Sequence, residues 1–174
     1  MTYPVSSTLG AAFGETYLSS STNLDYPRPP FTLGTRAVGN DGSEWIYVQA
    51  AGTIAVNSTV IISNTWTIAA TTGAAAVSGV PNMVGFAHVA FAANTYGWVM
   101  LRGKPTILVA ANTEVNVALW TTDTAGVLSS TANTASQYMV WDVRTYGTSA
   151  GASQTIATAM TGNPVIRIPR SNLP

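Results

Sequence analysis

The chain has 174 residues, no cysteine, one histidine, and seven basic residues against seven acidic ones. The absence of cysteine excludes disulfides, cysteine-ligated metals and thiolate catalysis. The seven basic residues are too few and too scattered to form a stripe that could neutralise several phosphates of a nucleic acid. Charged residues make up 8% of the chain, against about 25% in ordinary globular domains. We interpret this deficit as a surface partly covered by other subunits, because interfaces are depleted in Lys, Glu and Asp. A surface covered by Ser, Thr, Asn and Gln instead is the alternative.

The length fits one domain whose hydrophobic core needs no covalent staples. No apolar run approaches the ~18 residues of a membrane-spanning helix, so no membrane partner is expected. The first residues lack the basic and apolar regions of a secretory signal, which favours a protein made in a reducing cytoplasm.

Residues 1–30 differ from the rest of the chain and predict an extended N-terminal arm outside a β-domain that covers residues 31–174. They are rich in Ser, Thr and Gly, and they end in a Pro-rich run, which should be stiff because proline fixes φ. Disordered tails are usually poor in aromatic residues, whereas this arm holds several, so we expect it to lie along a groove of a partner. An arm that folds back onto its own sheet is the alternative. The candidate contact residues of the arm are Tyr3, Phe13, Tyr17, Leu18, Leu24, Tyr26, Pro27 and Arg28.

Strand signals dominate after the arm. Gly39–Gly42 has the chemistry of a hairpin turn, and runs of β-branched and aromatic residues alternate with short clusters of Gly, Asn, Thr and Ser. Helical periodicity is weak. The pattern predicts an all-β fold, a single sandwich or small barrel of about eight to ten short antiparallel strands. The predicted strands are Leu33–Val38, Glu44–Gln49, Thr59–Ile62, Thr65–Ala69, Val84–Phe91, Tyr96–Leu101, Thr106–Val109, Val115–Trp120, Tyr138–Arg144 and Val165–Ile168.

The run Val84–Phe91 carries apolar side chains on both of its faces, so we expect it to be covered on both sides by a second sheet, the arm or a partner. It contains His88, the only histidine. A catalytic histidine needs a nucleophile and an orienting group beside it, and the sequence neighbours of His88 are apolar. We therefore predict a structural histidine at an interface or sheet edge, and we add Phe86 and His88 to the candidate interface residues.

The remaining residues show no pattern of a catalytic or metal-binding site. Most carboxylates are isolated, and the hairpin explains the proximity of Asp41 and Glu44. The sequence has neither the spacing of a zinc site nor an Asp-rich calcium loop. The five tryptophans could stack on sugars, but in strands they are more simply core or interface residues. We predict no enzyme, no cofactor and no metal.

Three segments resemble small proteins encoded in the structural gene clusters of tailed bacteriophages: Phe31–Arg36 with Asn40–Ala50, Val84–Ala87 with Tyr96–Val99, and Leu119–Leu128. The resemblance implies a head decoration, or cement, protein that binds the outer capsid surface of a virion assembled in the host bacterial cytoplasm. Its implied partners are the major capsid protein and further copies of itself, with a homotrimer expected first and a dimer second. The alternative is a carbohydrate-binding or adhesin-like fibre module of a phage virion.

Overall fold

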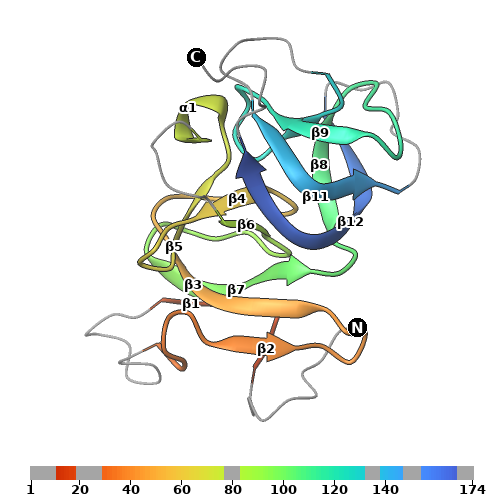
Figure 1. Ribbon diagram of the computed structural model, residues 1–174. Coiled ribbons are helices and arrows are strands. Elements are labelled where there is room, and N and C mark those ends of the chain that lie inside the picture. Colours follow the sequence, from red (N-terminus) through yellow and green to blue (C-terminus); the bar gives the residue numbers. More distant parts are fainter. Residues whose placement is uncertain (1–10, 19–28, 77–82, 132–137, 147–153, 168–174) are drawn as a thin grey trace.

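The computed structural model describes residues 11–18, 29–76, 83–131, 138–146 and 154–167 (Figure 1). These residues are all-β apart from one helical turn, α1 (Gly73–Ala76), which confirms the predicted fold class. None of the helical structure in these ranges is long and apolar enough to cross a membrane. The strands are β1 (Thr16–Leu18), β2 (Arg36–Val38), β3 (Glu44–Ala50), β4 (Thr59–Ile62), β5 (Thr67–Ala70), β6 (Met83–Phe86), β7 (Thr95–Arg102), β8 (Thr106–Ala110), β9 (Ala118–Thr121), β10 (Leu128–Ser129), β11 (Met139–Thr145) and β12 (Gln154–Arg167).

Five of the strands close into a small barrel. β3 pairs with β5 and β7, β5 pairs with β4, β4 pairs with β6, and β6 pairs with β7, so the circuit returns to its start. Aliphatic side chains such as Ile46, Val48, Val60 and Val99 form a buried cluster within it. The sequence predicted that all strands are antiparallel. This is wrong for β5, which returns beside β3 after β4 and therefore runs parallel to β3.

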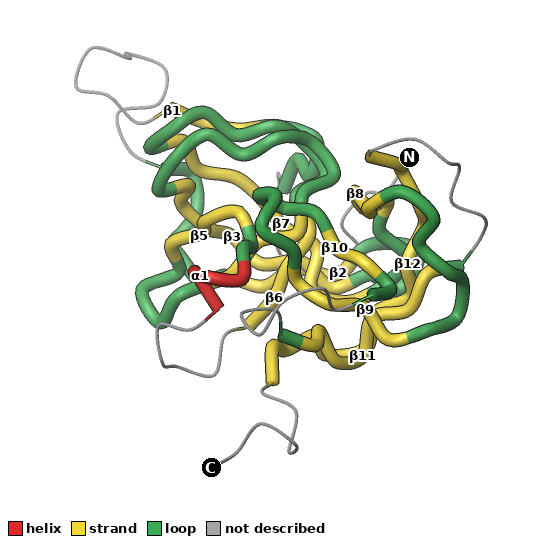
Figure 2. The backbone as a smooth tube through the Cα atoms, turned by 90° about the horizontal axis from the view of Figure 1, so that it is seen from above, coloured by secondary structure: helices red, strands yellow, loops and turns green. Residues whose placement is uncertain are grey.

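The C-terminal strands make a second closed circuit. β12 pairs with β11 and β8, β11 pairs with β9, β9 with β10, and β10 with β8. β12 can reach both neighbours because residues 154–158 pair with β8 and residues 159–167 pair with β11. The two groups lie side by side (Figure 2), joined where Val165 pairs with Met83 and where Gly103 pairs with Thr161. The predicted small barrel is thus present, and the C-terminal strands add a second closed circuit beside it.

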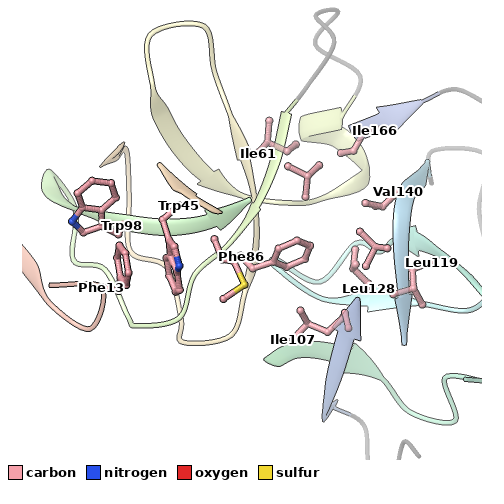
Figure 3. Close-up of a cluster of buried hydrophobic side chains, with 14 of the residues drawn as sticks. Phe13, Trp45, Ile61, Phe86, Trp98, Ile107, Leu119, Leu128, Val140 and Ile166 are labelled. Atoms are coloured by element: carbon pink, nitrogen blue, oxygen red, sulfur yellow. The ribbon is translucent and has the colours of Figure 1, made fainter. Parts of the chain in front are cut away.

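One of the two buried apolar clusters spans both groups of strands. Phe86 of β6 lies between an aromatic group beside the first barrel and an aliphatic group inside the second circuit (Figure 3). The aromatic group consists of Phe13, Trp45, Tyr47 and Trp98, and the aliphatic group includes Ile107, Leu119, Leu128 and Val140. Gly85 turns toward the barrel interior, where a Cβ atom would lie 3.1 Å from side-chain atoms of Ile62 and Val99. β6 is therefore covered on both faces, as predicted. It ends at Phe86 and not at Phe91, because Phe86 pairs with Thr59, the first residue of β4.

Part of the predicted arm belongs to the β-domain. Phe13 is buried, and its ring stacks on Trp45 with a centroid distance of 4.5 Å and an interplanar angle of 7°. β1 pairs antiparallel with β7, which places Thr16 opposite Gly97. The prediction that residues 1–30 lie outside the core is wrong for residues 11–18, because burying the Phe13 ring removes a large apolar surface from water. For these residues the fold-back alternative is correct.

Replacing Phe13 by Ala should lower the free energy of unfolding by about 3–5 kcal/mol, because it leaves a cavity beside Trp45. The matched control is Leu18→Ala in the same segment: the Leu18 side chain is 53% exposed, so its loss should cost less than about 1 kcal/mol. Denaturant unfolding of the full chain, followed by tryptophan fluorescence, measures both. Equally small effects would contradict a core role for residues 11–18.

A turn of the second circuit contacts the first barrel at Gly126. Its N–H donates to the carbonyl of Thr71 at 2.8 Å, and its carbonyl accepts from the N–H of Thr59 at 2.9 Å. The backbone of Gly126 has φ +75°, and a Cβ atom would lie 2.6 Å from the Cβ atom of Ser58. Both the conformation and the close approach therefore require glycine.

Gly126→Ala should destabilise the protein by about 2 kcal/mol or more, and Gly42→Ala by about 1 kcal/mol. Gly42 is the matched control, because it has a similar φ of +78° with no atom within 4 Å of its Cβ position. The difference between the two unfolding free energies isolates the contact with Ser58. Equal losses would mean that this contact contributes nothing to joining the two circuits.

Candidate functional site

The structure describes five of the ten predicted interface residues and does not bring them together. Phe13 and Phe86 are core residues, and this corrects the prediction for both, because their own chain covers their side chains. Tyr17 is half-buried and Leu18 exposed on β1, which pairs on one side with β7 and meets no second strand in the described part of the chain. Tyr3, Leu24, Tyr26, Pro27 and Arg28 lie outside the described residues.

His88 is exposed in the loop that follows β6, and not within a strand as predicted. Its ring lies edge-on to Trp45, with a centroid distance of 6.0 Å and an interplanar angle of 86°. His88 therefore extends the aromatic group around Trp45 to the surface.

The aromatic group holds two buried polar atoms that have no hydrogen-bond partner among the described residues, Tyr47 Oη and Trp98 Nε1. Phe31 packs edge-on against both rings, with centroid distances of 5.3 and 5.1 Å. Burial, reinforced by the nearby Tyr17 and Tyr96 hydroxyls, raises the pKa of Tyr47 well above its ordinary value.

This raised pKa gives the stability of the protein an alkaline limit. The unfolded chain releases the Tyr47 proton first, so the contribution of Tyr47 is complete below the ordinary tyrosine pKa of about 10 and is lost as the pH rises above it. Tyr47→Phe should match or slightly exceed the wild-type stability at neutral pH, because it removes a buried hydroxyl without a described partner. Above about pH 10 it should lose less stability than the wild type. Tyr146→Phe, at an exposed position, is the control, and an identical alkaline loss in all three proteins would contradict this role of Tyr47.

A hollow lies along the outer face of β11 and β12. This β11–β12 groove has a volume of about 750 Å³. A smaller hollow of about 330 Å³ shares Arg102, Met160 and Thr161 with it and reaches the Asp41–Gly42 turn and Lys104. The β11–β12 groove is lined by Arg102, Val115, Asn116, Asp142, Arg144, Thr145, Tyr146, Met160, Thr161 and Gly162.

Strand alternation and one irregularity set the outer face of β11. Val140 and Val143 point into the second circuit, whereas Arg144 and its cross-strand partner Met160 are exposed. The pairing of β11 with β12 shifts register between Trp141 and Val143, and the intervening Asp142 has φ +61°. This irregularity leaves two consecutive side chains, those of Trp141 and Asp142, exposed.

Large apolar side chains gather on this face. Tyr146 is 68% exposed, Met160 is 50% exposed and Val115 is 47% exposed, and all three line the groove. Trp141, on the same face of β11, is the only exposed one of the five tryptophans, all of which lie in the described ranges. Exposed apolar side chains that gather in one place, surrounded by polar groups, mark interaction sites on soluble proteins.

Two guanidinium groups in the groove are held by their own chain. Arg102 Nη1 forms an ion pair with Glu44 Oε1 at 3.2 Å, and Arg144 Nη1 donates to the carbonyl of Asn116 at 2.9 Å. Within the described ranges, no ion pair involves Arg144 or Asp142, and no three His, Cys, Asp or Glu side chains cluster as metal ligands do. The groove thus offers fixed donors and an acceptor beside apolar side chains.

The groove residues were not among those predicted from the sequence. The only signal was the alternation of large and charged side chains in Trp141–Tyr146, which the prediction treated as an ordinary strand and its end. Compared with known proteins, the chain matches no protein-family model and no curated protein.

Proposed function

We propose that the protein is a structural virion protein without catalytic activity that binds the outer surface of a bacteriophage capsid and stabilises it. The observation that carries this proposal is the β11–β12 groove, which suits contact with another protein chain of the assembled particle. Its exposed Tyr146, Met160, Arg102 and Arg144 belong to the residue types enriched at protein interfaces, and exposed Trp141 lies on the same face. The resemblance of the segment from residue 31 to about residue 130 supplies the class of partner.

The scaffold behind the groove suits a permanent assembly role. Arg102 at the end of β7 and Met160 of β12 meet in the groove, although they belong to different circuits. The Gly103–Thr161 bridge fixes these strands to each other, with the N–H of Thr161 donating to the carbonyl of Gly103 at 2.9 Å. A binding face held by backbone hydrogen bonds loses little conformational entropy when a partner binds.

Stabilisation of the capsid follows from linked equilibria. A protein that binds the mature shell and not its disrupted form raises the stability of the shell by an amount set by its concentration relative to Kd. Many weakly bound copies then add to a large effect for each particle. Copies that also contact one another bind more tightly, because the second contact becomes intramolecular.

Adding the protein to purified heads that lack it should raise the temperature at which the heads release DNA. Met160→Glu should reduce this shift and weaken co-sedimentation with heads at least about tenfold, because it puts a charge into the groove and so weakens the contact by which neighbouring copies hold one another on the shell. The matched control is Val56→Glu, since Val56 is a similarly exposed apolar residue outside the groove. Heads that are equally stable with and without the wild-type protein would contradict a cement role.

The alternative function, a carbohydrate-binding or adhesin-like fibre module, is favoured by one observation. The exposed Tyr146 ring lines a groove together with Asp142 and Asn116, and the volume of this groove lies in the range of ligand sites. An aromatic ring offers a stacking surface for a sugar, and the polar side chains can bind its hydroxyls. Glycan-array binding that is lost in Tyr146→Ala, with no binding to heads, would favour this alternative.

A further inference from the structure

The charges on the outer face of β11 have a self-complementary arrangement. Asp142 and Arg144 have opposite charges, are two residues apart on one strand, and are both exposed. Neither has an ion-pair partner in the part of the chain that the structure describes. The carbonyl of Asn116 holds one nitrogen of the Arg144 guanidinium, which has five N–H donors in total and so keeps others for a partner.

A second copy of β11 can lie face to face with the first, related to it by a 180° rotation about an axis that lies between the two faces and crosses the strand near Val143. Arg144 of each copy then lies opposite Asp142 of the other copy. Two reciprocal ion pairs then form from one strand and its copy, which is the defining property of a two-fold contact. We infer that the protein forms a two-fold symmetric dimer through the outer face of β11 and β12. The inference deepens the proposed function by naming the occupant of the groove.

The apolar residues around the charge pair fit this occupant. Tyr146, Met160, Val115 and Trp141 are exposed on this face and would be covered by the same side chains of the second copy. Faces of packed sheets lie about 10 Å apart, a spacing at which long side chains from both sides interdigitate. Apolar contact supplies attraction without direction, whereas the two charge pairs set the orientation of the copies.

The charge pattern favours a two-fold dimer over the trimer that the resemblance implied. In a three-fold ring the groove faces a different surface of the neighbouring copy, so Asp142 and Arg144 do not pair with each other. In the dimer the groove is covered, and the capsid contact of the proposed function is then made by another face of each copy. The dimer forms without heads, which allows it to be tested separately.

The test is charge reversal followed by mixing, with the full chain in sedimentation velocity over the widest concentration range its solubility allows. The wild type should dimerise, more weakly at high salt. Asp142→Arg alone and Arg144→Asp alone each place like charges against each other twice and should weaken the dimer at least about tenfold. The double variant should dimerise again, and so should a mixture of the two single variants, because each then meets the opposite charge.

The left-handed backbone at Asp142 tolerates Asn better than Arg, so Asp142→Asn serves as a second partner for Arg144→Asp in the mixing experiment. Circular dichroism and the unfolding midpoint establish that each variant is folded. A wild type that stays monomeric, or single variants that dimerise like the wild type, would overturn the inference. Single variants that dissociate but do not associate when mixed would also overturn it, and would indicate a contact with a different surface.

These outcomes are separate from those of the proposed function. Heads that gain no stability from a protein that dimerises as described would remove the cement role and leave the dimer intact. A monomeric wild type that still stabilises heads would remove the dimer and leave the cement role intact.

Discussion

The structure depends on the burial of β6 between two groups of strands. Gly85 faces the interior of the first barrel, and Phe86 reaches the side chains of the second circuit, so one four-residue strand contributes to both packing regions (Figure 3). Because Phe86 belongs to the cluster that spans both groups, the two circuits share part of the stabilisation that apolar burial provides. The shape of the groove follows from this arrangement, since its walls come from the end of β7 in one circuit and from β11, β12 and the segment before β9 in the other.

The sequence predicted those parts of the fold whose signal is local. Strand β4 lies where Thr59–Ile62 was predicted, and β3 extends the predicted Glu44–Gln49 by one residue, because runs of β-branched and aromatic residues favour strands wherever they pack. Long-range pairing determined what the sequence did not predict. β1 has only three residues, and β12 contains Gly162 and Pro164 within a strand that β8 and β11 hold in place.

The candidate site was harder to predict than the fold for the same reason. Its residues come from four separate segments, and no segment contains enough of them to stand out. The φ of +61° at Asp142 exposes a second consecutive side chain that simple alternation would have placed inside. The low charge content pointed to covered surface in general, but composition carries no information on where a covered face lies.

Electron cryomicroscopy of intact heads is the most direct test of the proposed role as a structural subunit of the capsid surface. We expect paired two-circuit densities on the outside of the shell, with the outer faces of β11 and β12 turned toward each other and a different face against the capsid. Heads that show no density for the protein would contradict the capsid role, whereas isolated copies whose β11–β12 groove is open to solvent would contradict the dimer.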